Sequence, residues 1–127
     1  MRFSLMITAG PDHPAASTAL QLAQALLQGG HQIVRLFFYR QGVLLANRLT
    51  GADHLALCQS WQKLIVEHQL DAVVCVSAAL RRGVVDADES ARQGLDSDNL
   101  APGFQLGGLG QWADALVHSD RSLSLGP

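Results

Sequence analysis

The segment Asp71-Ala-Val-Val-Cys-Val76, followed by Ser77-Ala-Ala-Leu-Arg-Arg82, decides the fold class of this chain. Its first half is an almost unbroken apolar run, which is typical of a central parallel strand that helices cover on both faces. Its second half contains neither glycine nor a β-branched residue and suits a helical turn. We therefore predict a buried strand that ends near Cys75 and gives way directly to a helix.

Toward the N-terminus, two further apolar segments enclose an amphipathic helix. Residues Arg2–Thr8 and His31–Tyr39 are β-prone, and residues 14–28 between them carry an apolar stripe at helical spacing. Gly29-Gly30 ends that helix. A strand, a helix of this length and a second strand together predict a right-handed βαβ unit.

The rest of the chain continues this alternation. The remaining elements are expected to be short helices at 42–48 and near 86–92, a long helix at 53–68, a loop at 94–104, a helix at 109–117 and an edge strand at 120–125. This pattern predicts a single α/β domain over 1–127 with a three-layer, flavodoxin-like architecture. Its sheet should be mostly parallel, with about five strands and helices on both faces.

Composition excludes several classes of function. The 127 residues have a net charge of −2 and scattered basic residues, so direct binding to nucleic acid is not expected. No apolar run is long enough for a membrane span, and the N-terminus lacks the pattern of a signal peptide, so we expect a cytoplasmic protein. Because 48% of the residues are hydrophobic and only 16% charged, we expect part of the apolar surface to contact another subunit.

The two cysteines, Cys58 and Cys75, have the spacing of neither a disulfide framework nor a zinc site. Cys75 lies at the carboxyl end of its strand, where parallel α/β sheets collect their ligand chemistry. It is therefore the candidate nucleophile, although a small buried hydrophobe in the core is an equally open reading at this point. Cys58 falls on the apolar face of the helix at 53–68 and is expected to be structural.

Other side chains have both a functional and a structural interpretation. Arg81 and Arg82 could favour a thiolate at Cys75, or could complement the negative end of their own helix. The histidines show no metal-ligand spacing, and His13 is a weak candidate because its loop lies near the expected active face. The aromatic residues Phe37–Tyr39, Trp61 and Trp112 are expected to pack in the core or at an interface.

Two longer segments carry a resemblance to a known family. They are Phe37-Phe38-Tyr39-Arg40-Gln41-Gly42-Val43 with Asn47, and Cys75-Val-Ser-Ala-Ala-Leu-Arg-Arg-Gly-Val-Val-Asp86. Shorter matches occur at Met1-Arg2-Phe3, Thr8-Ala9-Gly10-Pro11, Gln24-Ala25-Leu26, Asn99-Leu100 and Leu106–Gly110. Together they make nearly the whole chain resemble the TusD/DsrE family of sulfur-relay proteins.

The resemblance implies a sulfurtransferase subunit whose reactive cysteine maps onto Cys75, which would carry sulfur as a persulfide. It implies a heterohexamer with two smaller paralogous subunits (TusB/TusC or DsrH/DsrF-like), a TusA-like sulfur donor and a TusE/DsrC-like acceptor. The isolated chain could also form a homo-oligomer. The pathway would be 2-thiolation of the tRNA wobble uridine or intracellular sulfur oxidation, and neither a metal nor an organic cofactor is needed.

Two other functions remain open from the sequence. Cys75 and Arg81 have the Cys-x5-Arg spacing of cysteine-dependent phosphatases and arsenate reductases, although the intervening residues lack glycine. Alternatively, Ala9-Gly10-Pro11 and the following helix could hold the phosphate of a nucleotide or flavin, as in a flavodoxin-like binding module.

Overall fold

Five strands form one sheet, in which every neighbouring pair is parallel. They are β1 (Arg2–Ile7), β2 (Gln32–Phe38), β3 (Ala72–Cys75), β4 (Phe104–Gly107) and β5 (Arg121–Leu125). The order across the sheet is β4-β3-β2-β1-β5, so β3 is enclosed between two strands and β5 lies at an edge. The computed structural model describes residues 1–127. The predicted parallel α/β fold is confirmed.

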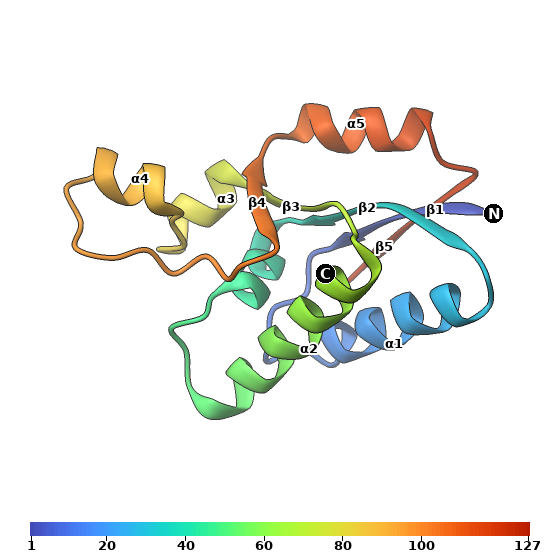
Figure 1. The fold of residues 1–127 in the computed structure, drawn as a ribbon, viewed down its shortest axis with the longest axis horizontal. Helices are drawn as coiled ribbons and strands as arrows, with labels where there is room; N and C mark the ends of the chain where they lie inside the picture. Colours follow the sequence, from blue (N-terminus) through green and yellow to red (C-terminus); the bar gives the residue numbers. More distant parts are fainter.

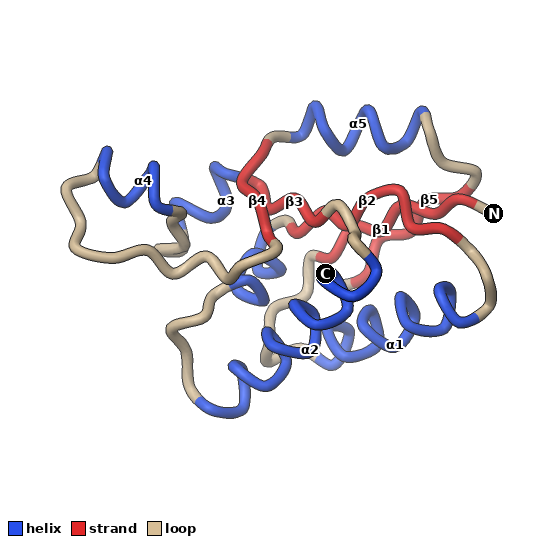
Figure 2. The backbone as a smooth tube through the Cα atoms, in the orientation of Figure 1, coloured by secondary structure: helices blue, strands red, loops and turns tan.

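Helices cover both faces of this sheet. They are α1 (Pro14–Gln28), the 3-10 helix η1 (Arg40–Ala46), α2 (Ala52–His68), α3 (Val76–Arg81), α4 (Ala87–Arg92) and α5 (Leu109–Val117). Figure 1 shows α1 and α2 together on one face and α5 on the other, with α3 and α4 beyond the end of β3. This arrangement follows from right-handed crossovers, because the chain steps from β1 to β4 in one direction and then returns to β5. Figure 2 shows the same three layers.

Local sequence determines where the helices begin and end. The imidazole of His13 accepts a hydrogen bond from the Ala15 amide, and Pro14 occupies the first turn of α1. The carboxylate of Asp86 accepts from the Glu89 amide at the start of α4, the short helix predicted near 86–92. These caps satisfy backbone N–H groups that would otherwise have no partner.

Two adjacent aromatic residues of β2 pack against helices on opposite faces of the sheet. The Phe37 ring lies 6.0 Å from that of Trp112 on α5, whereas the Phe38 ring lies 5.3 Å from that of Trp61 on α2. Successive side chains of a strand point to opposite faces, so this pair joins both outer layers to the sheet. Phe37, Phe38 and Trp61 are fully buried, which confirms their predicted packing role.

Several element boundaries differ from the sequence-based prediction by one or two residues, the helix predicted at 42–48 is the 3-10 helix η1 at Arg40–Ala46, and one strand was not predicted. Val76 already belongs to α3, so the strand before it ends at Cys75. The predicted loop at 94–104 runs into a strand that the sequence did not reveal, β4, because glycines flank its four residues on both sides. No helix is long and apolar enough to cross a membrane.

Candidate functional site

The carboxyl ends of β2, β3 and β4 meet at a pocket with a volume of about 530 Å³. Three segments line it: Tyr39-Arg40 after β2, Cys75–Ala78 with Arg81-Arg82 around α3, and Gly108-Leu109 before α5. After β4 the chain goes to the opposite face of the sheet from α1 and α2 (Figure 1). Such a change of direction is where parallel α/β sheets place their ligand sites.

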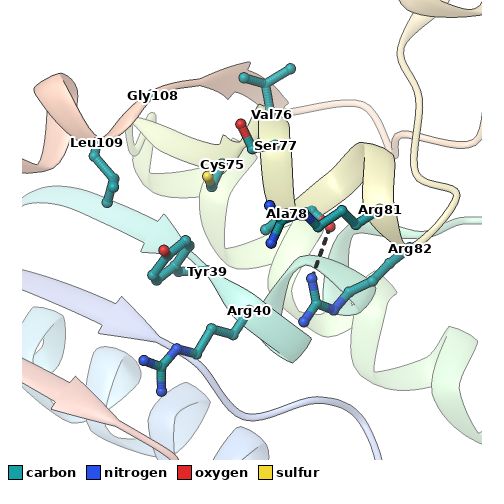
Figure 3. A pocket seen from close by; sticks show the side chains of 10 residues that line it. All are labelled: Tyr39, Arg40, Cys75, Val76, Ser77, Ala78, Arg81, Arg82, Gly108 and Leu109. Carbon is teal, nitrogen blue, oxygen red and sulfur yellow. Dashed lines mark hydrogen bonds between the residues drawn. The ribbon is translucent and has the colours of Figure 1, made fainter.

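Cys75 forms part of the wall of this pocket and is 5% exposed. It is the last residue of β3, paired in register with Gly107, and also the N-cap of α3. Its side chain makes no capping hydrogen bond, so the sulfur is not engaged with its own helix. Figure 3 shows the sulfur facing the space between Tyr39 and Leu109. Cys75 therefore packs against the core, as the structural interpretation requires, and also faces the pocket.

The position of Arg40 depends on an unusual backbone. Its φ of 51° lies in the left-handed region, which costs a residue with a side chain about 1–2 kcal/mol. The chain turns here because the Gly42 amide donates to the Tyr39 carbonyl, while the Tyr39 amide donates to the Ile7 carbonyl of β1. Gly42 lies against the Ile7 carbonyl so closely that a Cβ would stand 2.0 Å from its oxygen. The turn thus carries Arg40 to the edge of the pocket.

Three arginines around the pocket lack an acidic partner. Arg40, Arg81 and Arg82 line it, and no carboxylate does. In contrast, Arg2, Arg35, Arg48 and Arg92 all form ion pairs with aspartate or glutamate. The pocket is therefore a concentration of positive charge in a chain whose net charge is −2.

Arg82 shows the structural one of the two roles that the sequence left open, at the end of α3. Its Nη1 donates to the Ala78 carbonyl over 3.1 Å, which satisfies a carbonyl near the end of α3. Its Nε is buried and has no hydrogen-bond partner. Arg81 is exposed and makes no such bond, and in Figure 3 its side chain runs back along α3 toward the side where Cys75 lies.

Known proteins resemble this chain over almost its whole length. The sequence model described as the DsrE/DsrF-like family matches residues 1–125. The chain belongs to this family. It is 50% identical over 125 residues to "Sulfurtransferase TusD" of Salmonella arizonae, with 95% of this chain and 97% of that protein covered. "Sulfurtransferase TusD" of Salmonella newport is 48% identical over 124 residues, with the same coverage.

A solved structure of another protein, with much lower sequence identity, has the same fold as this DsrE/DsrF-like chain. The crystal structure of the ychN protein from E. coli superposes with a TM-score of 0.68, covering 98% of this chain and 99% of that one. The two sequences are 17% identical, so this likeness supports the fold alone. The predicted resemblance to the TusD/DsrE family is confirmed.

Cys58 lies away from the pocket, as expected of a structural residue. It is 1% exposed on the inner face of α2, and burial raises the pKa of its thiol to about 11. A thiol that keeps its proton at neutral pH is a poor nucleophile. His13 is also outside the pocket, where it caps α1, and no group of three or more His, Cys, Asp or Glu side chains could hold a metal ion.

The geometry disfavours both alternative functions. A phosphatase-type loop needs the amides between its cysteine and arginine to surround one anion, but residues 76–81 form the helix α3. The helix that follows Gly10-Pro11 has its first free amide capped by His13, and this loop does not line the pocket. Neither arrangement is the phosphate cradle that the corresponding function would require.

Sequence reasoning missed the part of the pocket contributed by neighbouring strands. Tyr39 was assigned to packing and Arg40 to no role, yet both line the pocket of this DsrE/DsrF-like chain. Their place directly after a parallel strand was an available signal, because the carboxyl ends of parallel strands share one edge of the sheet. Gly108 and Leu109 gave no such signal, since β4 itself was not recognised.

Proposed function

We propose that this chain is a sulfurtransferase subunit that accepts sulfur as a persulfide on Cys75 and passes it to a thiol of a partner protein. The observation that carries this proposal is that Cys75 is the only cysteine lining the pocket and shares it with three arginines that have no acidic partner. The two TusD relatives, each about half identical to this chain, are named as sulfurtransferases, which supports a sulfur-transfer role.

The chemistry needs no group beyond the thiol. The Cys75 thiolate attacks the outer sulfur of a donor persulfide, a new S–S bond forms on Cys75, and the donor leaves as a thiol. In the second step an acceptor thiolate attacks the outer sulfur on Cys75, which returns to a thiolate. The guanidinium groups of Arg40, Arg81 and Arg82 line the same pocket, where they can pair with the negative charge that the outer sulfur carries.

The partners follow from the same proposal. The donor is a TusA-like carrier and the acceptor a TusE/DsrC-like protein, and two smaller paralogous subunits complete a heterohexamer. Surface composition supports an assembly, since large apolar side chains such as Leu109, Leu116 and Val117 of α5 are 49%, 42% and 80% exposed. The destination is 2-thiolation of the tRNA wobble uridine or intracellular sulfur oxidation, which use the same thiol chemistry.

The test is intact-protein mass after incubation with a cysteine desulfurase, cysteine and a TusA-like carrier. Wild type is compared with Cys75→Ser and with Cys58→Ala as the matched control. We expect a gain of one sulfur that reductant removes and that only Cys75→Ser abolishes. No gain in any variant, with the partner subunits also supplied, would rule out the persulfide mechanism.

A further inference from the structure

The positive charge of the pocket exceeds what a persulfide on Cys75 requires. Arg81 ends α3, a helix of six residues that begins directly after Cys75 and is only about 9 Å long, and Arg82 is its C-cap. Arg40 approaches from the end of β2, on another side of the pocket. Placing three guanidinium groups around one cavity without a carboxylate costs mutual repulsion, which a bound anion would offset.

The enclosure of these groups indicates how large the anion is. The Nε of Arg82 is buried without an acceptor, and Cys75 is only 5% exposed. The pocket, with a volume of about 530 Å³, is too small to take in a folded protein surface. A small anion can enter the pocket, where guanidinium groups donate paired hydrogen bonds to oxyanion oxygens.

We propose that this pocket binds thiosulfate and that Cys75 takes its outer sulfur directly, without a protein donor. The inference rests on the proposed function, because it uses the same persulfide on Cys75. It adds a small-molecule substrate class, namely sulfur oxyanions that carry a transferable sulfur atom. The arginines bind the sulfonate end, and the outer sulfur then faces the Cys75 thiolate.

The step balances without an added oxidant or reductant. An electron pair of the Cys75 thiolate attacks the outer sulfur of thiosulfate and forms the new S–S bond. The S–S bond of thiosulfate breaks, and its electron pair leaves with the SO₃ group as sulfite. Three negative charges are present before and after the step, since thiolate and thiosulfate become persulfide anion and sulfite. The guanidinium groups stabilise the charge that develops on the departing sulfite.

The experiment incubates the purified chain with thiosulfate alone and measures both intact mass and released sulfite. We expect one sulfur gained per sulfite released, with no gain in Cys75→Ser. Arg81→Gln, which removes an exposed side chain without a hydrogen-bond partner, should lower the initial rate about tenfold or more, because a charged hydrogen bond to the anion is lost. Arg121→Gln is the matched control, since it removes an exposed arginine of β5 that is remote from the pocket.

Each outcome separates this inference from the proposed function. Loading by desulfurase and carrier but not by thiosulfate would overturn the inference and leave the relay function standing. Loading by neither route would overturn both. Loading by thiosulfate at equal rates in wild type, Arg81→Gln and Arg40→Gln would show that the arginines do not form the anion site. Thermal unfolding of each variant verifies that a lost rate is not a lost fold.

Discussion

Cys58 and Cys75 are both nearly inaccessible to water, yet their surroundings differ in chemistry. Cys58 packs within the core on α2, and its thiol pKa is raised to about 11 because burial disfavours the thiolate. Cys75 ends β3 beside unpaired arginines. The two sulfurs therefore differ in which strand end or helix face holds them and not in exposed area, and the reactivity proposed for Cys75 depends on that position.

The raised pKa of Cys58 predicts a pH dependence of stability. Above pH 9 the unfolded thiol loses its proton while the native thiol keeps it until about pH 11. The unfolded state then binds fewer protons, so the free energy of unfolding falls as pH rises through this window, by up to about 3 kcal/mol. Below pH 9 this contribution is fully present. Urea titrations of wild type and Cys58→Ala at several pH values should show the additional fall only in wild type. Parallel curves would contradict the prediction.

Arg40 and Gln69 are the two non-glycine residues with left-handed backbones, at φ values of 51° and 52°. Gln69 caps the end of α2, where glycine is preferred. We expect Gln69→Gly to stabilise the protein by roughly 0.5–1 kcal/mol without a change in sulfur transfer. Arg40→Gly should relieve similar strain but slow sulfur loading of Cys75, because a guanidinium group leaves the pocket. Thermal unfolding measures the stability of each variant, and the mass assay measures its rate of sulfur loading. Unchanged loading in Arg40→Gly would show that the strained backbone at Arg40 does not contribute to sulfur transfer.

Among the elements, η1 determines how the end of β2 meets the pocket. A Cβ on Gly42 would stand 2.0 Å from the Ile7 carbonyl oxygen, so Gly42→Ala must displace η1 from β1. We expect a loss of about 1–3 kcal/mol and slower transfer, because Tyr39 and Arg40 move with this helix. Gly110→Ala is the control, since nothing lies near its added Cβ and alanine favours α5. Equal stability of the two variants, by chemical denaturation, would show that η1 tolerates displacement.

The helices and strands also show how much of the fold can be predicted from the sequence. The long helices α1 and α2 are predictable because apolar residues recur at helical spacing over many residues. In contrast, Phe104–Gly107 is too short and too closely flanked by glycines to differ from a loop in the sequence, and pairing with β3 in the folded sheet makes it a strand. The Cys75 side of the pocket was predictable because its residues are contiguous, whereas Leu109 depended on this unrecognised strand.

For the whole molecule, the alternation of strands and helices indicates the parallel sheet, but not the place of its last strand. Arg121–Leu125 is mostly exposed, so its side chains do not specify which edge it joins. It pairs with β1, and the Asp120 amide bonds to the Arg2 carbonyl while the Arg2 amide bonds to the Asp120 carboxylate. Backbone pairing along β1, rather than apolar burial, thus determines the position of β5.

This arrangement predicts that β5 stabilises the fold by pairing with the backbone of β1. Deleting residues 121–127 should lower the free energy of unfolding by roughly 3 kcal/mol or more through lost hydrogen bonds. It also leaves β1 as an unpaired edge, so the truncated chain should aggregate. Leu123→Lys keeps the backbone pairing and alters a side chain that is 41% exposed, so it should change stability little. Light scattering and urea unfolding compare the two. A truncated chain that stays as stable and as dispersed as wild type would mean that β1 needs no partner, and the fold would then be held by its other four strands alone.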